Sequence, residues 1–422
     1  MATSSQHVHD HDSGEGLVPV EEAREGLLAK IDPLQPLQLP LADAYGCVLA
    51  ADVIADRDLP EFASSAMDGF AVRSGEVGSA SSTQPVELRV VGRALIGQRP
   101  EATVGGGEAV RIATGAPIPA GADTIVPIEN CEVAGDRVRI LAGSSPGRHI
   151  RPSGEDVKGG EVLMKAGRQL GPGELGLLAT AGFAHPTVHP RPRVVVLSTG
   201  DELVPPSQPT EFGQVRDSNA YLLYAALREA GAQPVMAGIV PDDVDQLKEV
   251  ILSHLVQADA FVSSGGVSVG ERDVVKAAFF RRGELDFYKV AMQPGMPQGF
   301  GHIEGTPYFG LPGNPVSVFV SFEVFLRPAL MKMSGRKNLF RPEVAARLAA
   351  DVTGPRGKMQ FARVSVKRDR DGSFVATPTG GRGSNLIATV SRANGLAIVP
   401  AGTETAPAGS QVKVWLFRSA VD

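Results

Sequence analysis

The stretch Ala260–Asp273, AFVSSGGVSVGERD, decides how the centre of this chain is expected to fold. It begins with apolar residues typical of a buried strand, continues with Ser263, Ser264 and two glycines, and ends in an acid–base–acid triplet. The following run, Val274–Arg282, has the character of a helix. A strand that ends in glycines and leads into a helix leaves backbone N–H groups free to bind an anion. A tight turn beside a solvated charge cluster would have the same sequence, so the stretch alone leaves both interpretations open.

The surrounding segment, residues 193–335, alternates predicted strands and helices, which is typical of a doubly wound α/β domain. The predicted strands are 194–197, 235–240, 260–262, 285–291 and 308–310, and the predicted helices are 218–230, 244–256, 274–282 and 315–333. Each strand ends in a polar cluster: Ser198–Glu202, Pro241–Asp243, Ser263–Gly266, Met292–Gly295 and Leu311–Pro315. Ligands bind at the carboxyl edge of open α/β sheets, whereas residues needed only for a core would be scattered over both edges. We therefore expect one composite binding site.

The composition is that of a globular protein. The 422 residues carry a net charge of −6, and 43% of them are hydrophobic; this length predicts two to four domains. The apolar runs are too short to span a bilayer and no secretory leader opens the chain, so we expect a cytoplasmic protein that binds no membrane. The negative charge argues against a nucleic-acid partner. The two cysteines, Cys47 and Cys131, form no metal-binding or redox motif.

Short β-runs lie on both sides of the α/β segment. The runs 86–91, 109–113, 124–128 and 138–141 predict a small β-domain, and the runs 344–349, 360–367, 374–378, 395–399 and 411–417 predict a C-terminal β-barrel domain. We thus expect a multidomain α/β plus β fold. Its predicted parts are a disordered tail (1–15), an N-terminal linker domain (16–60 and 157–190), an inserted small β-domain (61–156), the central doubly wound α/β domain (191–335) and the C-terminal β-domain (336–422).

Three local patterns in the first 70 residues give only weak or ambiguous predictions. His7, His9 and His11 alternate and are able to bind a transition metal, but a tail without that role is the simpler interpretation. Residues 42–51 predict a short helix. The pair Asp68-Gly69 predicts either a hairpin turn or a loop that presents Asp68 to a ligand.

The chemistry of the expected site follows from its residue types. Glycine turns favour phosphate or another oxyanion, but five acids at the same edge would repel one: Asp201, Glu202, Asp242, Asp243 and Asp273. A Mg²⁺ ion between these acids and a phosphate would resolve the conflict. The chain has no dinucleotide-binding Gly-x-Gly-x-x-Gly motif at the first strand–helix turn and no P-loop. No nucleophile–base pair stands out, so positioning and charge stabilisation are the expected means of catalysis.

The motifs, taken together, resemble one known family. They are, in the family's order, Ser65–Val72, Thr114–Pro117, Gly154–Asp156, Ser198–Leu203, Ser263–Gly270 and Gly310–Ser317. The chain resembles the molybdopterin molybdenumtransferases, the MoeA-type molybdenum insertases that include the E domain of gephyrin, over about residues 17–418. The resemblance implies that adenylylated molybdopterin and molybdate react to give molybdenum cofactor and AMP. It makes the α/β domain molybdopterin-binding-like. It also implies a homodimer, with each site completed by the small β-domain of the second subunit.

The resemblance assigns the site residue by residue. Those expected to act in catalysis are Asp68, Thr114, Asp156, Glu202, Asp242 and Asp273, and three of them, Glu202, Asp242 and Asp273, are expected to hold Mg²⁺ or to orient the pterin. The expected substrate-binding residues are Ser264, Gly265, Gly266, Ser268, Lys289, Pro312, Gly313, Asn314, Pro315, Arg363 and Ser384. Of these, Ser264–Gly266 would contact a phosphate through backbone N–H groups. Lys289 and Arg363 would supply positive charge for molybdate or the pyrophosphate.

The sequence departs from the family pattern at the expected oxyanion site. Gln293 and Met296 stand where family members often have lysines, Phe70 replaces a usual tyrosine, and Pro152-Ser153 stands where some relatives are basic. Two other functions stay open: a cofactor carrier or scaffold without turnover, and a molybdopterin adenylyltransferase, which resembles only the α/β segment. As partners, the resemblance implies a molybdopterin adenylyltransferase that supplies the substrate and molybdoenzymes that receive the product.

Overall fold

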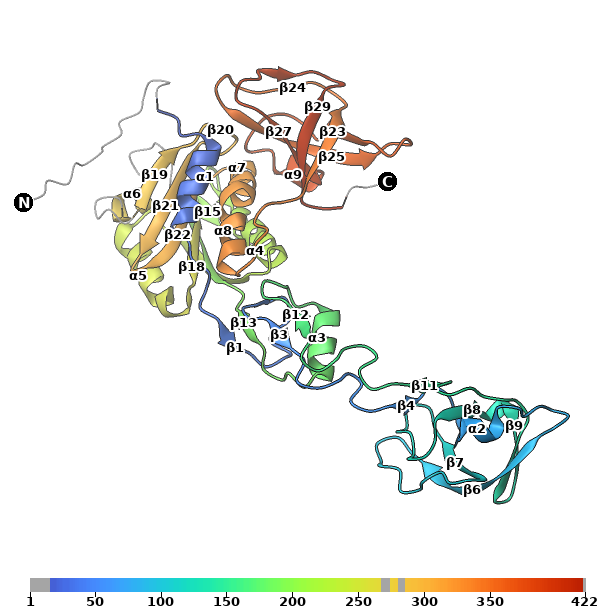
Figure 1. The fold of residues 1–422 in the computed structure, drawn as a ribbon. Coiled ribbons are helices and arrows are strands. Elements are labelled where there is room, and N and C mark those ends of the chain that lie inside the picture. Colours follow the sequence, from blue (N-terminus) through green and yellow to red (C-terminus); the bar gives the residue numbers. More distant parts are fainter. Residues whose placement is uncertain (1–15, 267–273, 280–284, 420–422) are drawn as a thin grey trace, which may run out of the picture.

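The computed structural model describes residues 16–266, 274–279 and 285–419, so the expected tail and its three histidines lie outside the described residues. The molecule is elongated (Figure 1). A small β-domain forms one end, and an α/β domain together with a C-terminal barrel forms the other. A slender linker domain lies between them. None of the described helices combines the length and apolar character that a bilayer crossing requires.

The α/β domain is built on a six-stranded sheet with the order β17-β14-β18-β22-β21-β19. These strands are β14 Arg193–Thr199, β17 Gln233–Val240, β18 Ala260–Ser264, β19 Leu285–Lys289, β21 Pro297–Ile303 and β22 Thr306–Leu311. The helices α4 Asn219–Glu229, α5 Val244–His254 and α6 Val274–Phe279 connect them. Every residue of β18 is buried, so the stretch Ala260–Asp273 begins in the core, as predicted.

One strand of this sheet, β21, was not predicted. It is antiparallel to both neighbours, β19 and β22. Its sequence, PQGFGHI, has two glycines and no apolar alternation, so it carries little strand signal. Because two antiparallel pairings separate β19 from β22, these two strands run in the same direction. The polar cluster after β19 therefore leaves the sheet at the same edge as the clusters after β14, β18 and β22.

The predicted helix 315–333 is a continuous helical segment with an irregular centre. It consists of α7 Pro315–Ser321, the π-helical turn η4 Phe322–Leu326 and α8 Arg327–Met333. The π turn immediately precedes Pro328, which has no N–H to donate to the preceding turn; a wider turn lets the helix continue past it. The segment is buried almost throughout and forms much of the largest core. It packs with α1 Val20–Ala29, whose Val20, Ala23 and Leu27 belong to the same core.

The small β-domain contains a six-stranded sheet with the order β8-β5-β7-β6-β10-β9. Its strands are β5 Gly69–Val72, β6 Val86–Ala94, β7 Glu108–Ile112, β8 Thr124–Pro127, β9 Cys131–Ala134 and β10 Arg137–Ile140, which confirms the predicted β-runs. A hairpin at Asp68-Gly69 is wrong, because the preceding strand β4 Ser64–Ser65 pairs with β11 Ile150–Arg151, whereas β5 pairs with β7 and β8. Gly69 is needed for a close approach instead: a Cβ there would lie 2.0 Å from the Val126 carbonyl oxygen.

The linker domain contains short strands and one helix: β1 Leu37–Gln38, β2 Val48–Leu49, β3 Val53–Ile54, β12 Val162–Met164, α3 Pro172–Thr180 and β13 Thr187–His189. Its two chain segments pair with each other, because β1 and β2 pair with β13 and β3 pairs with β12. The helix predicted at 42–51 is wrong. These residues form turns and the strand β2, since the second segment offers strand partners that local sequence does not reveal.

The C-terminal barrel is a closed ring with the order β25-β26-β23-β29-β27-β25. Its strands are β23 Glu343–Leu348, β25 Met359–Arg368, β26 Phe374–Pro378, β27 Gly395–Val399 and β29 Gln411–Leu416, and a short helix, α9 Ile387–Ser391, follows β26. The strand β20 Met292–Gln293, which leaves the α/β sheet, pairs in parallel with β25. The α/β domain and the barrel are therefore joined by backbone hydrogen bonds.

Candidate functional site

The glycines after β18 pack tightly against the end of β14 and against α6. Gly265 and Gly266 both have positive φ, +92° and +69°. A Cβ would lie 2.8 Å from the Thr199 carbonyl oxygen at the first position and 2.6 Å from Val275 at the second. The Gly265 N–H donates to the Leu311 carbonyl at 3.0 Å. The glycine turn after β18 therefore lies against the carboxyl ends of its neighbours β14 and β22.

This edge contains polar groups that are buried without a protein partner. Ser264 Oγ lies 3.1 Å from Ser198 Oγ, and Asn219 Nδ2 donates to the Gly313 carbonyl at 2.7 Å. Within the described residues, however, Thr199 Oγ1 and Asn219 Oδ1 are buried and have no hydrogen-bond partner. Such atoms are uncommon in native proteins and are costly in a fold without a ligand. Their position at the end of β14 and the start of α4 is consistent with a polar ligand at the edge.

The acids Asp201, Glu202 and Asp242 gather on the β14–β17 side of the edge. The Asp242 N–H donates to Asp201 Oδ1 at 3.1 Å. Burial raises the pKa of the Asp242 carboxyl, and the charges of Asp201 and Glu202 raise it further. In the described part of the chain, no group of three or more His, Cys, Asp or Glu side chains is placed to hold a metal ion. Asp273, the third expected metal ligand, lies outside the described residues, as does Ser268.

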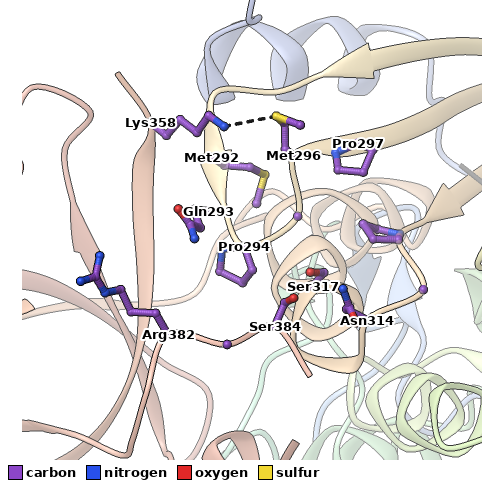
Figure 2. Close-up of a pocket in the computed structure, with 14 residues that line it drawn as sticks. Met292, Gln293, Pro294, Met296, Pro297, Asn314, Ser317, Lys358, Arg382 and Ser384 are labelled. Atoms are coloured by element: carbon purple, nitrogen blue, oxygen red, sulfur yellow. Dashed lines mark hydrogen bonds between the residues drawn. The ribbon is translucent and has the colours of Figure 1, made fainter. Parts of the chain in front are cut away.

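A second feature, a cavity of about 580 Å³, lies between the α/β domain and the barrel (Figure 2). It includes four of the predicted substrate-binding residues, Pro312, Gly313, Asn314 and Ser384. The other lining residues are Met292, Gln293, Pro294, Gly295, Met296, Pro297, Ser317, Lys358, Arg382 and Gly383. A Cβ on Gly313 would lie 3.9 Å from Gly265 Cα, so this cavity adjoins the glycine turn of the sheet edge.

The charge of this cavity is positive. Among the described residues, its lining contains Lys358 and Arg382 and no acid. Neither cation was among the predicted site residues. Arg382 belongs to the glycine-rich loop 379–385 that the sequence marks as polar, whereas Lys358 has no local signal, because its position depends on the pairing of β25 with β20. The amide of Asn314 and the hydroxyls of Ser317 and Ser384 add neutral polar groups.

Arg363 and Lys289, the cations expected from the sequence, lie elsewhere. Arg363 is 4% exposed, and its guanidinium donates from Nε to Thr389 Oγ1 at 3.1 Å and from Nη2 to the Gly381 carbonyl at 2.5 Å. Burial lowers the pKa of Arg363. Through its bond to the Gly381 carbonyl, the Arg363 guanidinium fixes the loop that contains Arg382 and Ser384. Lys289 ends β19 and does not line the cavity.

Pro315 opens α7 beside the cavity and is not part of its lining. The three predicted residues of the N-terminal half have hydrogen bonds to their own surroundings instead. The Thr114 N–H donates to Asp68 Oδ1 at 2.6 Å, and this bond, with a second from the Thr114 hydroxyl, lowers the pKa of Asp68. The Asp156 N–H donates to the Leu59 carbonyl at 3.0 Å. Figure 1 shows the small β-domain at the opposite end of the molecule from the α/β domain.

Three family models match successive parts of the chain. The MoeA N-terminal region (domain I and II) matches residues 18–182, the probable molybdopterin binding domain matches 195–332, and the MoeA C-terminal region (domain IV) matches 345–417. Among solved structures, a molybdopterin biosynthesis MoeA protein from Pyrococcus horikoshii has a TM-score of 0.79 and 33% identity, covering 96% of this chain and 100% of that one.

Whole-length relatives bear a common name. Molybdopterin molybdenumtransferase 2 of Mycobacterium tuberculosis is 42% identical over 402 residues, which cover 94% of this chain and 98% of that protein. Molybdopterin molybdenumtransferase 1 of the same species is 36% identical over 416 residues, with coverages of 94% and 98%. The enzyme of this name from Haemophilus influenzae is 32% identical over 405 residues, with coverages of 95% and 99%. The chain therefore belongs to the MoeA family of molybdopterin molybdenumtransferases.

Proposed function

We propose that this protein inserts molybdenum into molybdopterin, taking adenylylated molybdopterin and molybdate as substrates and releasing molybdenum cofactor and AMP. The observation that carries the proposal is the adjacency of two different sites. One is a glycine-lined sheet edge with a cluster of acids, and the other is a cavity whose described lining residues include two cations and no acid. Gly313 borders both, so a phosphate-bearing pterin and a separate oxyanion would be held side by side.

The sheet edge is the proposed place of the phosphate. Backbone N–H groups of Ser264–Gly266 would contact it. Burial and the charges of Asp201 and Glu202 raise the pKa of Asp242, and a cation between Asp242 and Glu202 would relieve the repulsion between these acids. These two residues, with Asp273, would hold Mg²⁺, which would supply charge neutralisation at the phosphate. The chain itself would orient the phosphate and hold the Asp242 and Glu202 carboxyl groups at the edge.

The cavity is the proposed place of molybdate, a tetrahedral dianion. A group of hydroxyl, amide and cationic donors without any carboxylate favours such an ion. Arg363 supports the cavity by fixing the loop of Ser384 through its bond to the Gly381 carbonyl. The bond from the Val316 N–H to the Ser384 carbonyl, 3.0 Å long, ties that loop to α7. The oxyanion site is thus shaped by both domains.

We further propose that the enzyme works as a homodimer. Asp68 immediately precedes β5 of the small β-domain, and Thr114 donates to its carboxylate; Figure 1 shows this domain at the opposite end of the molecule from the α/β domain. In a two-fold dimer the contacts are reciprocal, so a small β-domain of each copy that reached the sheet edge of the other would complete both sites alike. The Asp68 carboxylate, with its lowered pKa, would then enter the site as an anion. We expect a cytoplasmic enzyme that receives its pterin from a molybdopterin adenylyltransferase and passes its product to molybdoenzymes.

The deciding experiment is an AMP-release assay. The protein is incubated with adenylylated molybdopterin and Mg²⁺, with and without molybdate, and AMP is quantified. Molybdate-dependent AMP release is the expected result. Tight binding of the pterin without AMP release would instead support a carrier or scaffold, and formation of adenylylated pterin from ATP and molybdopterin would support an adenylyltransferase.

A further inference from the structure

One cation of the cavity has an unusual neighbour. Lys358 Nζ lies 3.3 Å from the Met296 sulfur, the contact drawn as a dashed line in Figure 2. A thioether is a weak acceptor and carries no charge, so it does not neutralise an ammonium group. Among the described residues, no carboxylate lies within ion-pair distance of Lys358, and no acid lines the cavity. The Lys358 ammonium therefore has no counter-charge in the described part of the chain, and the N–H groups that do not point at Met296 are available to a ligand.

The backbone holds Lys358 and Met296 in fixed relative positions. The residue after Lys358 donates its N–H to the Ala291 carbonyl at 2.8 Å, as part of the β20–β25 connection. Met296 accepts at its carbonyl from the Val290 N–H, also at 2.8 Å. Gln298, which is 1% exposed, donates from Nε2 to the Gly295 carbonyl at 2.5 Å and to Ser321 Oγ at 2.6 Å, so the turn before Met296 is braced from behind. The ammonium is thus presented by a preorganised frame.

The second cation, Arg382, is less suited to the same task. Its side chain is exposed, whereas Lys358 and Met296 are half-buried. A charge in water is screened and its interactions contribute little, while a partly buried charge acts more strongly. Figure 2 also shows the Arg382 side chain extending away from Ser384. Burial and direction both favour Lys358 as the charge that a bound anion would meet.

We propose that Lys358, a residue of the C-terminal domain, is the principal cation that binds the oxyanion in this cavity. A lysine at position 296 would place its ammonium near the same point and would take over this role if Lys358 were removed. The proposal rests on the proposed function only for the identity of the anion, molybdate. The sequence has Gln293 and Met296 at the two sites on the α/β side where charge was expected. In this chain, Lys358 supplies positive charge from the barrel side of the cavity.

Direct binding tests the first half of the proposal. Lys358→Gln removes the charge but keeps most of the side chain, and titration calorimetry with sodium molybdate, without pterin, measures Kd. A hydrogen bond from a charged donor corresponds to about a tenfold to hundredfold change in Kd, so a loss of at least about tenfold is expected. The matched control is Lys367→Gln, an exposed lysine on β25 outside the cavity, which should bind molybdate like the wild type.

Moving the ammonium group from position 358 to position 296 tests the second half of the proposal. Because Lys358 Nζ lies 3.3 Å from the Met296 sulfur, the double variant Met296→Lys, Lys358→Met returns an ammonium to nearly the same point. It should recover most of the lost molybdate affinity, and the KM for the pterin should stay constant through the series. A purely structural role for Lys358 would not be rescued in this way.

The outcomes separate this inference from the proposed function. Wild-type molybdate affinity in Lys358→Gln, or a wild-type protein that binds no molybdate by calorimetry, would overturn the inference. Molybdate binding that depends on Lys358, in a protein that releases no AMP, would sustain the inference and refute the insertase activity. Molybdate-dependent AMP release that Lys358→Gln leaves unchanged, in both KM for molybdate and kcat, would refute the inference alone.

Discussion

At the scale of single residues, two adjacent aspartates in one turn have different roles: Asp242 belongs to the proposed site, and Asp243 stabilises a helix. Asp242 lies near two other acids, and its raised pKa means that the folded protein resists its negative charge. Asp243 does the opposite: its Oδ1 accepts from the Asp245 and Gln246 N–H groups and caps α5. The sequence shows only Pro-Asp-Asp at a strand end. Which aspartate serves a ligand and which serves the helix depends on side-chain direction.

Replacing Asp242 by Asn should stabilise the protein at pH 7. A carboxyl whose pKa is raised on folding favours the folded state when protonated, and this contribution is lost as the pH rises through the folded-state pKa. The charged form therefore destabilises the fold above the ordinary carboxyl pKa of 3.8. Thermal unfolding should show a higher Tm for Asp242→Asn at pH 7 and a shrinking difference towards pH 4. A lower Tm at pH 7 would contradict the repulsion. Stabilisation by added Mg²⁺ should weaken in the same variant.

Replacing Asp243 by Ala should have the opposite sign. Two backbone N–H groups at the start of α5 lose their acceptor, and loss of such a cap costs about 1 kcal/mol. Chemical denaturation should show a lower midpoint with an unchanged slope. Asp243→Asn is the matched control, because asparagine caps helices almost as well as aspartate. Equal destabilisation by both variants would show that charge, and not capping, is the property that matters.

At the scale of elements, the long segment 315–333 depends on one buried ion pair. Glu323 lies in the π turn and is 4% exposed. It accepts from Arg341 Nε at 3.0 Å and from Arg341 Nη2 at 2.9 Å. Arg341 also reaches Glu229 at the end of α4, at 3.1 Å. The irregular turn, α4 and the segment leading to the barrel are thereby fixed together.

Replacing Glu323 by Gln should destabilise the protein by about 3 kcal/mol, because it leaves the half-buried Arg341 guanidinium without its principal counter-charge. Urea unfolding monitored by circular dichroism measures the change. Glu229→Gln removes the outer partner of the same arginine, and since the Glu229 side chain is 50% exposed, its effect should stay below about 1 kcal/mol. Similar losses in the two variants would argue against a special role of the buried pair.

Elements with strong local patterns were predictable, and those defined by distant partners were not. The strands β6, β7, β8 and β10 follow from short apolar runs between glycines and prolines, and β18 from its position before Ser-Ser-Gly-Gly. The strand β21 lacks that pattern and exists because β22 folds back to pair with it. Lys358 enters the cavity for a similar reason: the pairing of Met292 with Met359 brings together residues far apart in the sequence. The expected limits of the domains, at 60/61, 156/157, 190/191 and 335/336, stay a prediction.

At the scale of the whole molecule, the distance between Asp68 and the sheet edge makes the homodimer testable by complementation. Asp68→Ala and Glu202→Ala should each abolish AMP release, because each removes a group from every composite site. When the two variants are co-expressed, random pairing gives mixed dimers in which one of two sites contains both native residues. About a quarter of the wild-type activity should therefore return. The control is the same two proteins purified separately and assayed without subunit exchange. No recovery in the co-expressed sample would mean that each site belongs to one chain.

The pairing of β20 with β25 gives the barrel one wall of the oxyanion cavity, and this has a consequence for a cell that depends on the enzyme. If molybdate binds in the cavity as proposed, damage there would weaken the affinity for a nutrient whose concentration the medium sets, and a larger supply would offset the defect by mass action. Damage at the glycine edge would impair the handling of an internal intermediate, which added molybdate would not repair. The growth response to external molybdate would therefore show whether a mutation affects the cavity or the glycine edge.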